Sequence, residues 1–359
     1  MTSKKRRTNK PPKSIALYEA EVLPGLKTIA EAELTRRFAR QIHLLRSERE
    51  DQIGFHYLGD PQLLQQLQTI IAVYQIAHFD VPRPRALLGH QHLQRLLKQI
   101  TTLLSRYPAH TFHTFRISAA GQDSTIFNRL KDEIAQHTRL TLAEDEADLV
   151  LRIRGAIFAP TGWEVLVRLT PRPLATRPWR VHDMPGALNA TIAAAMIALT
   201  QPHPTDRFLN LMCGSGTLLI ERLRHSPAQA IIGGELNPTT LTLAQSNIQA
   251  AQLNQPVTLL NLDATATPFP AASFDVISID LPWGQLIGSH QENAQLYPQV
   301  LAEATRLARP QARLLIITHQ IKQFDQAIAN YANEWRCHTA QQVYQGGLHP
   351  KIYALQLTH

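Results

Sequence analysis

Cysteine is scarce in this chain of 359 residues. Only Cys213 and Cys337 occur, which excludes a disulfide framework and favours a reducing compartment. Uninterrupted apolar runs stay well short of the roughly 18 residues that a membrane span needs, so we expect no membrane contact. The basic N-terminus also lacks the apolar stretch of a secretory signal. We therefore expect a cytoplasmic protein.

Motifs for metal binding are also missing. The sequence contains 16 histidines, but neither an HExxH motif nor a pair of CxxC motifs accompanies them. Isolated histidines at irregular spacing are usually ordinary surface, loop or core residues. We therefore expect no bound metal.

Charge is distributed unevenly along the chain. Residues 1–180 hold 27 Lys and Arg against 17 Asp and Glu, whereas residues 181–359 hold 9 against 11. Such a basic first half suggests contact with a polyanion. Six of the positive charges lie in residues 1–13, which we predict to be a disordered basic tail. The excess is also compatible with ordinary solubility charge, so it identifies no partner by itself.

The first half of the sequence alternates short strands with helices, which is typical of small α+β units. We predict one unit over residues 14–87, a second over residues 88–170, and an interdomain linker over residues 171–185, which is rich in proline and arginine. Within the first unit, the proline-initiated segment 61–77 predicts a helix.

Longer strand–helix alternation fills residues 186–359. Apolar strands separated by helices predict a parallel sheet that is buried on both faces. The second half is therefore expected to be a doubly wound α/β domain, with ligands at the carboxyl ends of its strands.

A glycine turn follows the first predicted strand of this domain. Gly214 and Gly216 flank Ser215, and glycine allows the backbone to approach a ligand at a helix N-terminus. The third glycine of the dinucleotide fingerprint is missing, which argues against NAD. The segment that carries this turn contains Asn210, Cys213, Gly214, Ser215, Gly216 and Thr217.

Acidic residues end the next three predicted strands. Glu235, followed by Leu236, lies about 20 residues after the turn, where an acid can bind the hydroxyls of a ribose. Asp263 could accept from an adenine amino group while Ala264 offers a backbone N–H. With Asp280 at the fourth strand, these residues predict a pocket for a nucleoside, and the carboxylates favour a cationic one.

Asp280 begins the segment Asp280-Leu281-Pro282-Trp283-Gly284. An exocyclic amine on a base is a poor nucleophile, and two acceptors on its N–H groups favour its pyramidal form. Asp280 and the Leu281 carbonyl could be those acceptors, because Pro282 fixes the turn. Trp283 could stack on a base that has been swung out of its helix. A core tryptophan beside an ordinary loop is the alternative.

These residues resemble the class I methyltransferases that use S-adenosylmethionine and act on amino groups of bases. Their (D/N)-P-P-(F/Y/W) motif contributes a backbone carbonyl from its second position, where this chain has Leu281. The chain is most similar to the THUMP-domain guanine-N2 RNA methyltransferases, which often carry D-P-M-C-G-S-G-T where this chain has Asn210-Leu211-Met212-Cys213-Gly214-Ser215-Gly216-Thr217. The segments "YEAEVLPGLKTIAEAEL", "VLVRLTPRPLATRPWR" and "GGLHPKIYALQL" are similar to that family as well.

The resemblance implies an α/β fold, with a Rossmann-like class I methyltransferase domain at 186–359 preceded by a ferredoxin-like domain at 14–87 and a THUMP-like domain at 88–170. It also implies S-adenosylmethionine as cofactor. The cofactor-binding residues expected are Asn210, Cys213, Gly214, Ser215, Gly216, Thr217, Glu235, Leu236, Asp263 and Ala264. Two departures are Asn210, where the family usually has aspartate, and Met184-Pro185, where it has arginine-proline.

The expected activity is formation of N2-methylguanosine in tRNA, at an acceptor-stem guanosine in position six or ten, by a monomer. Ribosomal RNA is an alternative substrate. A DNA adenine-N6 methyltransferase and a non-catalytic RNA-binding protein are alternative functions. The catalytic residues expected are Asp280, Leu281, Pro282 and Trp283, and the RNA-binding residues expected are Arg83, Arg85, Arg116, Arg177, Arg180 and Lys351. Each of these basic residues could instead be a solvated surface charge.

Overall fold

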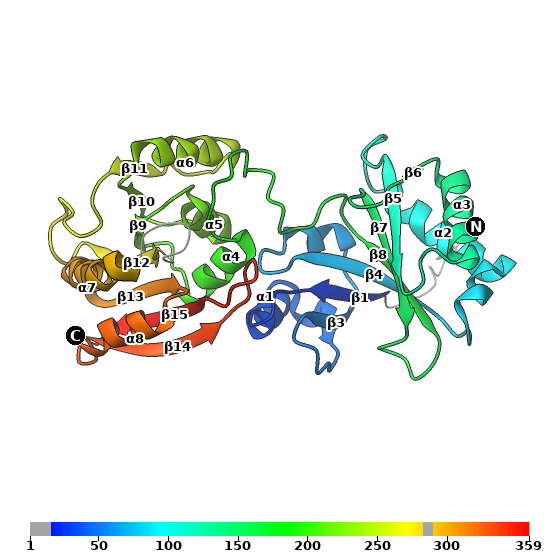
Figure 1. Ribbon diagram of the computed structural model, residues 1–359, viewed down its shortest axis with the longest axis horizontal. Helices are drawn as coiled ribbons and strands as arrows, with labels where there is room; N and C mark the ends of the chain where they lie inside the picture. The colour runs from blue at the N-terminus through cyan, green and yellow to red at the C-terminus, as the bar shows by residue number, and fades with distance from the viewer. Residues whose placement is uncertain (1–15, 283–289, 359) are drawn as a thin grey trace, which may run out of the picture.

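The computed structural model describes residues 16–282 and 290–358, which form two lobes (Figure 1). We call residues 16–170 the N-terminal lobe and residues 186–358 the C-terminal lobe; residues 171–185 connect them. Each lobe is built on one sheet. Within the described part of the chain, no helix combines the length and the apolar character that crossing a membrane requires.

The N-terminal lobe contains an eight-stranded sheet in the order β2-β3-β1-β4-β8-β7-β5-β6. Its strands are β1 (Ala16–Glu21), β2 (Ile42–Leu44), β3 (Gln52–Tyr57), β4 (Ala72–Phe79), β5 (Thr114–Ala119), β6 (Thr141–Leu142), β7 (Leu149–Gly155) and β8 (Trp163–Arg168). Its helices are α1 (Lys27–Phe38), α2 (His90–Leu104) and α3 (Thr125–Thr138), with short 3-10 turns η1 (Ala39–Gln41), η2 (Pro61–Gln66) and η3 (Pro84–Leu88).

The helix predicted over residues 61–77 is wrong. Only η2 is helical there, and the second part of the segment is β4. β4 lies in the middle of the sheet, paired with β1 on one edge and β8 on the other. These pairings bury six of its eight residues, so tertiary contacts override a local pattern that is also compatible with a helix.

The two predicted units of the first half share this sheet. Antiparallel pairing of β4 with β8 places Ala77 opposite Val165 and joins residues before and after position 88. One hydrophobic cluster also spans both segments, with Phe55 and Phe79 from the first and Phe115 from the second. The boundary predicted near residue 88 is therefore not a break in the sheet or in its core.

The C-terminal lobe contains a seven-stranded sheet in the order β11-β10-β9-β12-β13-β15-β14. Its strands are β9 (Arg207–Met212), β10 (Ala230–Glu235), β11 (Thr258–Asn261), β12 (Phe274–Asp280), β13 (Ala308–Thr318), β14 (Trp335–Gln342) and β15 (Lys351–Leu357). Its helices are α4 (Ala190–Leu199), α5 (Thr217–His225), α6 (Pro238–Ala250), α7 (His290–Leu307) and α8 (Ile321–Ala329).

Strands β9 to β13 are parallel, and β15 and β14 pair antiparallel at one end. Side chains of α7 and α8 pack on one face of the sheet, and those of α4 and α5 pack on the other. This is the doubly wound arrangement that the sequence predicts. The order of connections reverses between β9 and β12, which is where ligands bind in sheets of this type.

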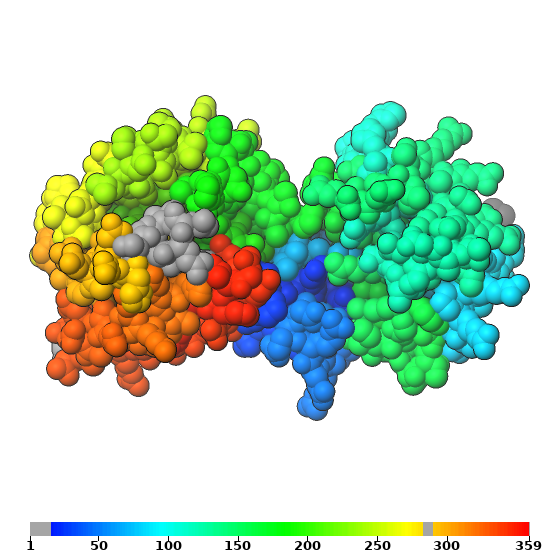
Figure 2. All heavy atoms as spheres, viewed as in Figure 1, coloured from blue at the N-terminus to red at the C-terminus, as the bar shows by residue number. Residues whose placement is uncertain are grey.

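The two lobes pack directly against each other. Leu26, just before α1, is fully buried in the same cluster as Val343 and Ile352 of the C-terminal lobe. Gly25 has a φ of +90°, and a Cβ there would lie 2.1 Å from the Gln342 carbonyl oxygen. The backbones therefore touch at this point, and a side chain at position 25 would push the lobes apart. Figure 2 shows that a notch remains between the lobes at the upper edge of the view.

His225, at the end of α5, faces the N-terminal lobe, where Arg36 Nη1 lies 3.0 Å from its Nε2. Burial, followed by the charge of Arg36, lowers the pKa of His225 to about 4 from its ordinary 6.5. The charges of Arg222 and Arg37 also lower the pKa of His225, and the charge of Glu33 raises it.

We expect His225 to make folding sensitive to acid. Below about pH 6.5 the unfolded chain binds a proton that folded His225 does not take up until about pH 4, so stability is lost as the pH falls through this window. Urea unfolding should be easier at about pH 5 than at about pH 7.5, and His225→Gln should remove about 1–2 kcal/mol of that difference. An unchanged pH dependence in the variant would contradict this role.

Candidate active site

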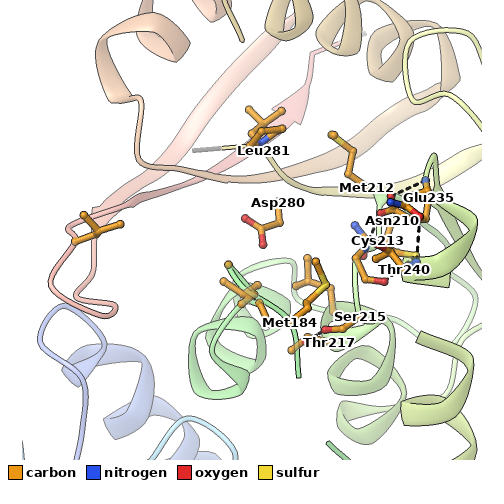
Figure 3. A pocket seen from close by; sticks show the side chains of 18 residues that line it. Met184, Asn210, Met212, Cys213, Ser215, Thr217, Glu235, Thr240, Asp280 and Leu281 are labelled. Carbon is orange, nitrogen blue, oxygen red and sulfur yellow. Dashed lines mark hydrogen bonds between the residues drawn. The ribbon is translucent and has the colours of Figure 1, made fainter. Parts of the chain in front are cut away.

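A cavity of about 310 Å³ lies at the carboxyl ends of β9, β10 and β12 (Figure 3). This is the switch point of the sheet. Nine of the residues expected to bind the cofactor or to act in catalysis line it: Asn210, Cys213, Gly214, Ser215, Thr217, Glu235, Asp280, Leu281 and Pro282. The predicted site residues of three strand ends therefore come together around one cavity.

The turn after β9 requires its glycines. Gly214 has a φ of +51° and Gly216 a φ of +85°, values at which a side chain is strained. The N–H of Cys213 donates to the Gly234 carbonyl at 2.8 Å, which fixes the start of the turn against β10. Helix α5 begins directly afterwards at Thr217, so its N-terminal end lies beside the cavity. Gly216 shapes this turn but does not line the cavity.

Glu235, the last residue of β10, supports the turn. Its Oε2 accepts a hydrogen bond from the N–H of Gly214 at 3.0 Å, and its Oε1 accepts one from the N–H of Asn237 at 3.0 Å. Each carboxylate oxygen has a second lone pair, so both can still accept hydroxyl groups of a ligand. Glu235 therefore shapes the cavity and contributes negative charge to its wall.

Asn210 bridges the two strands at the switch point. It is 1% exposed, and its Nδ2 donates to the Ser278 carbonyl of β12 at 2.9 Å. A carboxylate could not donate this hydrogen bond. This hydrogen bond therefore explains why an amide stands at position 210, which a comparison of motifs does not reveal.

Besides Gly216, three predicted cofactor-binding residues lie outside the cavity wall. Leu236 is 67% exposed beyond β10, and Ala264 is buried. Asp263 is exposed, and its Oδ1 accepts from the backbone N–H and the hydroxyl of Thr265 at 2.8 and 2.7 Å. Their contact with a cofactor stays a prediction.

Asp280 is the last residue of β12, and its carboxylate points into the cavity (Figure 3). Leu281 is 2% exposed, and its N–H donates to the Ile317 carbonyl at 3.1 Å. The Pro282 carbonyl accepts from Asn293 Nδ2 at 2.9 Å and from the Tyr297 hydroxyl at 2.7 Å. The turn is therefore held by α7. Trp283 lies outside the described residues.

Sequence reasoning missed the residues that hold this turn. Asn293 and Tyr297 are both nearly fully buried and lie one helical turn apart on α7. Burial raises the pKa of Tyr297 to about 12, so the phenol stays a neutral donor. Two polar residues four positions apart on an otherwise apolar helix face were the available signal.

The end of the connecting segment and the residues directly after it form another wall that sequence reasoning missed. Met184, Gly186 and Ala187 line the cavity together with Leu188. We predicted residues 171–185 to be an interdomain linker, with Arg177 and Arg180 as RNA contacts. The structure instead makes the end of this segment part of the site.

Two of the predicted RNA contacts lie inside the protein. The Arg177 side chain is 4% exposed; its Nε donates to Glu221 Oε1 at 2.9 Å and its Nη2 to the Gln68 carbonyl at 2.6 Å. The Arg180 side chain is 17% exposed, and its Nη2 donates to the Leu188 carbonyl at 2.8 Å. The prediction for Arg177 is wrong, because its guanidinium is buried in an ion pair with the Glu221 carboxylate. We retain neither Arg177 nor Arg180 as an RNA contact.

The other predicted RNA contacts lie nearer the surface. Arg83 and Arg85 are exposed, and Arg116 is half-buried with its Nη1 donating to the Asp145 carbonyl at 2.7 Å. Lys351 Nζ lies 3.6 Å from Asp325 Oδ1. These four stay predictions. Among the residues that the structure describes, no three His, Cys, Asp or Glu side chains form a group that could hold a metal ion.

Comparison with known proteins places this geometry in context. Residues 177–351 match the family model described as RMKL-like, methyltransferase domain. The chain is 32% identical over 189 residues to a mouse (Mus musculus) protein named tRNA (guanine(6)-N(2))-methyltransferase THUMP3; the match covers 49% of this chain and 37% of that protein. It is 26% identical over 288 residues to a Methanocaldococcus jannaschii protein named tRNA (guanine(6)-N2)-methyltransferase, covering 69% and 73% of the two chains.

Among solved structures, TrmN from Thermus thermophilus has a TM-score of 0.72 at 21% sequence identity, covering 95% of this chain and 99% of that one. The match to the mouse relative thus spans a little over a third of that protein. The match to the bacterial structure spans nearly all of it. The prediction of a Rossmann-like methyltransferase fold after an α+β segment is confirmed. Residues 177–351 are therefore similar to the RMKL-like methyltransferase domain, and the chain as a whole shares the fold of TrmN.

Proposed function

We propose that this protein is an RNA methyltransferase that uses S-adenosylmethionine to form N2-methylguanosine in tRNA. The observation that carries the proposal is the Asp280 carboxylate, which points into the cavity formed by the glycine turn and Glu235. The names of the relatives, which specify guanosine six, favour position six over position ten.

The charges of the cavity fit this cofactor. Glu235 and Asp280 line it, whereas no Lys or Arg is among the described residues of its wall. A phosphate-bearing ligand would meet two carboxylates there, but a sulfonium cation would be attracted to them. Glu235 is the residue we assign to the ribose, and the turn at Gly214 and Ser215 is assigned to the amino-acid part. When bound, S-adenosylmethionine supplies a methyl group on a positively charged sulfur.

The protein's own contribution is to orient the amine of the guanine. Asp280 accepts one N–H of the exocyclic amine and the Leu281 carbonyl accepts the other, which directs the nitrogen lone pair toward the methyl group. The Pro282 carbonyl is already engaged by Asn293 and Tyr297, so the turn does not need to reorganise during the reaction. Nitrogen gains the methyl group as the carbon–sulfur bond breaks, and the amine proton leaves to Asp280 or water. Stacking of the base is assigned to Trp283.

The N-terminal lobe is proposed to hold the RNA, in the manner of a THUMP-like domain. The exposed Arg83 and Arg85 and the half-buried Arg116 are its candidate phosphate contacts, and Lys351 is the candidate on the C-terminal lobe. Phosphate contacts position a nucleic acid without reading its sequence. Because the lobes pack directly against each other, the distance from such an anchor to Asp280 is fixed, and that distance would select the guanosine.

Incubation with labelled S-adenosylmethionine tests the proposal. Transfer RNA, ribosomal RNA and DNA are offered separately, and the modified nucleoside is identified by mass spectrometry. We expect N2-methylguanosine in tRNA only. Label in ribosomal RNA would show that the substrate is ribosomal RNA, and N6-methyladenine in DNA would show a DNA adenine methyltransferase. Label in none of the three would favour a non-catalytic binding protein.

Tyr297→Phe is expected to lower turnover about tenfold, because the Pro282 carbonyl then loses its 2.7 Å hydrogen bond and keeps only Asn293. The affinity for cofactor should stay within about twofold, since Tyr297 does not line the cavity. Steady-state kinetics and calorimetry separate the two quantities. A variant with full turnover would show that the hydroxyl does not hold the catalytic turn.

A further inference from the structure

Asn247 lies on α6, outside every motif of the site, and is fully buried. Its side chain contacts two segments that line the cavity. Its Oδ1 accepts from the backbone N–H groups of Val181 and His182 at 3.0 and 2.9 Å. Its Nδ2 donates to the His182 carbonyl at 3.0 Å and to the Ser215 carbonyl at 3.1 Å.

One amide therefore uses both of its donors and both lone pairs of its oxygen. No other side chain of this size presents two acceptor and two donor sites in one plane; aspartate has no donor, and leucine has neither. A buried polar group that is satisfied in this way costs little. Its removal leaves the His182 N–H without its acceptor and takes a donor from the His182 and Ser215 carbonyls, whereas the Val181 N–H keeps a second acceptor, the Trp179 carbonyl at 3.0 Å.

The two segments that Asn247 joins are walls of the cavity. Ser215 belongs to the glycine turn and lines the cavity, and Met184, two residues after His182, lines it from the connecting segment. Arg180 makes a second link between the same parts, because its Nη2 also donates to the hydroxyl of Thr217, the first residue of α5, at 3.0 Å. The connecting segment is thus fastened to the turn at two points.

We propose that Asn247 is a positioning residue that fixes the connecting segment against the glycine turn and thereby holds the cofactor cavity in its binding shape. The proposal rests on the proposed function, because it takes S-adenosylmethionine as the occupant of the cavity. Asn247 itself does not line the cavity, so its effect passes through Met184 and Ser215. Cofactor affinity thereby depends on the same segment that joins the two lobes.

The test uses the whole chain and S-adenosylhomocysteine, the demethylated form of the cofactor, as the calorimetric probe. Asn247→Leu keeps the branching and the number of heavy atoms of the side chain and removes all four hydrogen bonds. We expect its dissociation constant to rise at least about tenfold. Hydrogen exchange at the N–H of His182, followed by mass spectrometry, should become faster in the same variant, because this group loses its acceptor.

Asp206→Asn is the matched control. Asp206 is 3% exposed and also makes several hydrogen bonds, with Arg222, Arg313 and the N–H of His203, but it lies at the amino end of β9 and does not line the cavity. Its substitution should destabilise the lobe and leave the dissociation constant within about twofold. If the dissociation constant of the probe rises equally in both variants, general destabilisation of the lobe explains the result and the proposal is wrong.

Two further results are decisive. The proposal would be overturned if Asn247→Leu bound the probe as the unaltered chain does, or if exchange at the His182 N–H stayed slow. Should Asn247→Leu fail to fold, Asn247→Asp keeps the acceptor oxygen but loses both donors, and it should still weaken binding. If the unaltered chain fails to bind the probe, the proposed function fails, while the exchange data still decide whether Asn247 holds the segment.

Discussion

Asp280→Ala is expected to lower methyl transfer to tRNA by at least about 10²–10³-fold, the range seen when one group aimed at a transition state is removed. The reason is that the Asp280 carboxylate, at the end of β12, points into the cavity where the amine must be oriented. Cofactor affinity should change much less, because Glu235 and the glycine turn remain. Single-turnover kinetics and calorimetry measure the two effects separately.

Asp275→Asn is the matched control for this prediction. Asp275 lies near the other end of the same strand, where its carboxylate accepts from the Arg207 N–H at 2.8 Å and from Arg309. Its loss should affect stability and leave turnover per folded molecule unchanged. Normal cofactor affinity together with persistent methyl transfer in Asp280→Ala would refute the role of Asp280.

Arg177→Met is expected to destabilise the protein by about 3–5 kcal/mol, the range for removing one partner of a buried ion pair. Glu221 is fully buried, and Arg177 is its cationic partner at 2.9 Å. Burial raises the pKa of Glu221 and Arg177 opposes that rise. Without the guanidinium, folding favours the protonated carboxyl, so the destabilisation should be larger at about pH 8 than at about pH 5.

Arg172→Met supplies the comparison, because the pair of Arg172 with Glu146 lies in solvent at 58% and 87% exposure. Exposed pairs contribute at most about 1 kcal/mol, so this change should be nearly silent. The double variant Arg177→Met, Glu221→Leu should recover much of the stability, since apolar groups can replace a buried pair. Equal effects of Arg172→Met and Arg177→Met in chemical denaturation would contradict the buried role.

The main features of the site could be predicted because they follow from strand order. Residues at the carboxyl ends of neighbouring parallel strands must meet, so the glycine turn, Glu235 and Asp280 were identified from spacing alone. The supporting residues could not be predicted in this way. Asn247 and Tyr297 lie on helices, and their partners are fixed by how those helices pack against the sheet.

The roles of the arginines could not be predicted from the sequence either. An arginine suits an exposed phosphate contact and a buried ion pair equally well, and what decides for Arg177 is Glu221, 44 residues away in the sequence. The helix predicted over residues 61–77 is wrong for a similar reason, because the second half of this segment becomes a strand only when β1 and β8 pair with it. In both cases the deciding partner is distant in sequence.

The pairing of β4 with β8 also has a consequence for synthesis on the ribosome. Tyr74 of β4 pairs with Arg168 of β8, so β4 has a free edge until nearly the whole N-terminal lobe has emerged. An unpaired edge of a strand that is buried in the finished fold invites pairing with other chains. Nascent chains that have emerged from the ribosome only as far as residues 88 to 160 should therefore depend most on chaperones, whereas those that have emerged beyond residue 170 can already close the sheet.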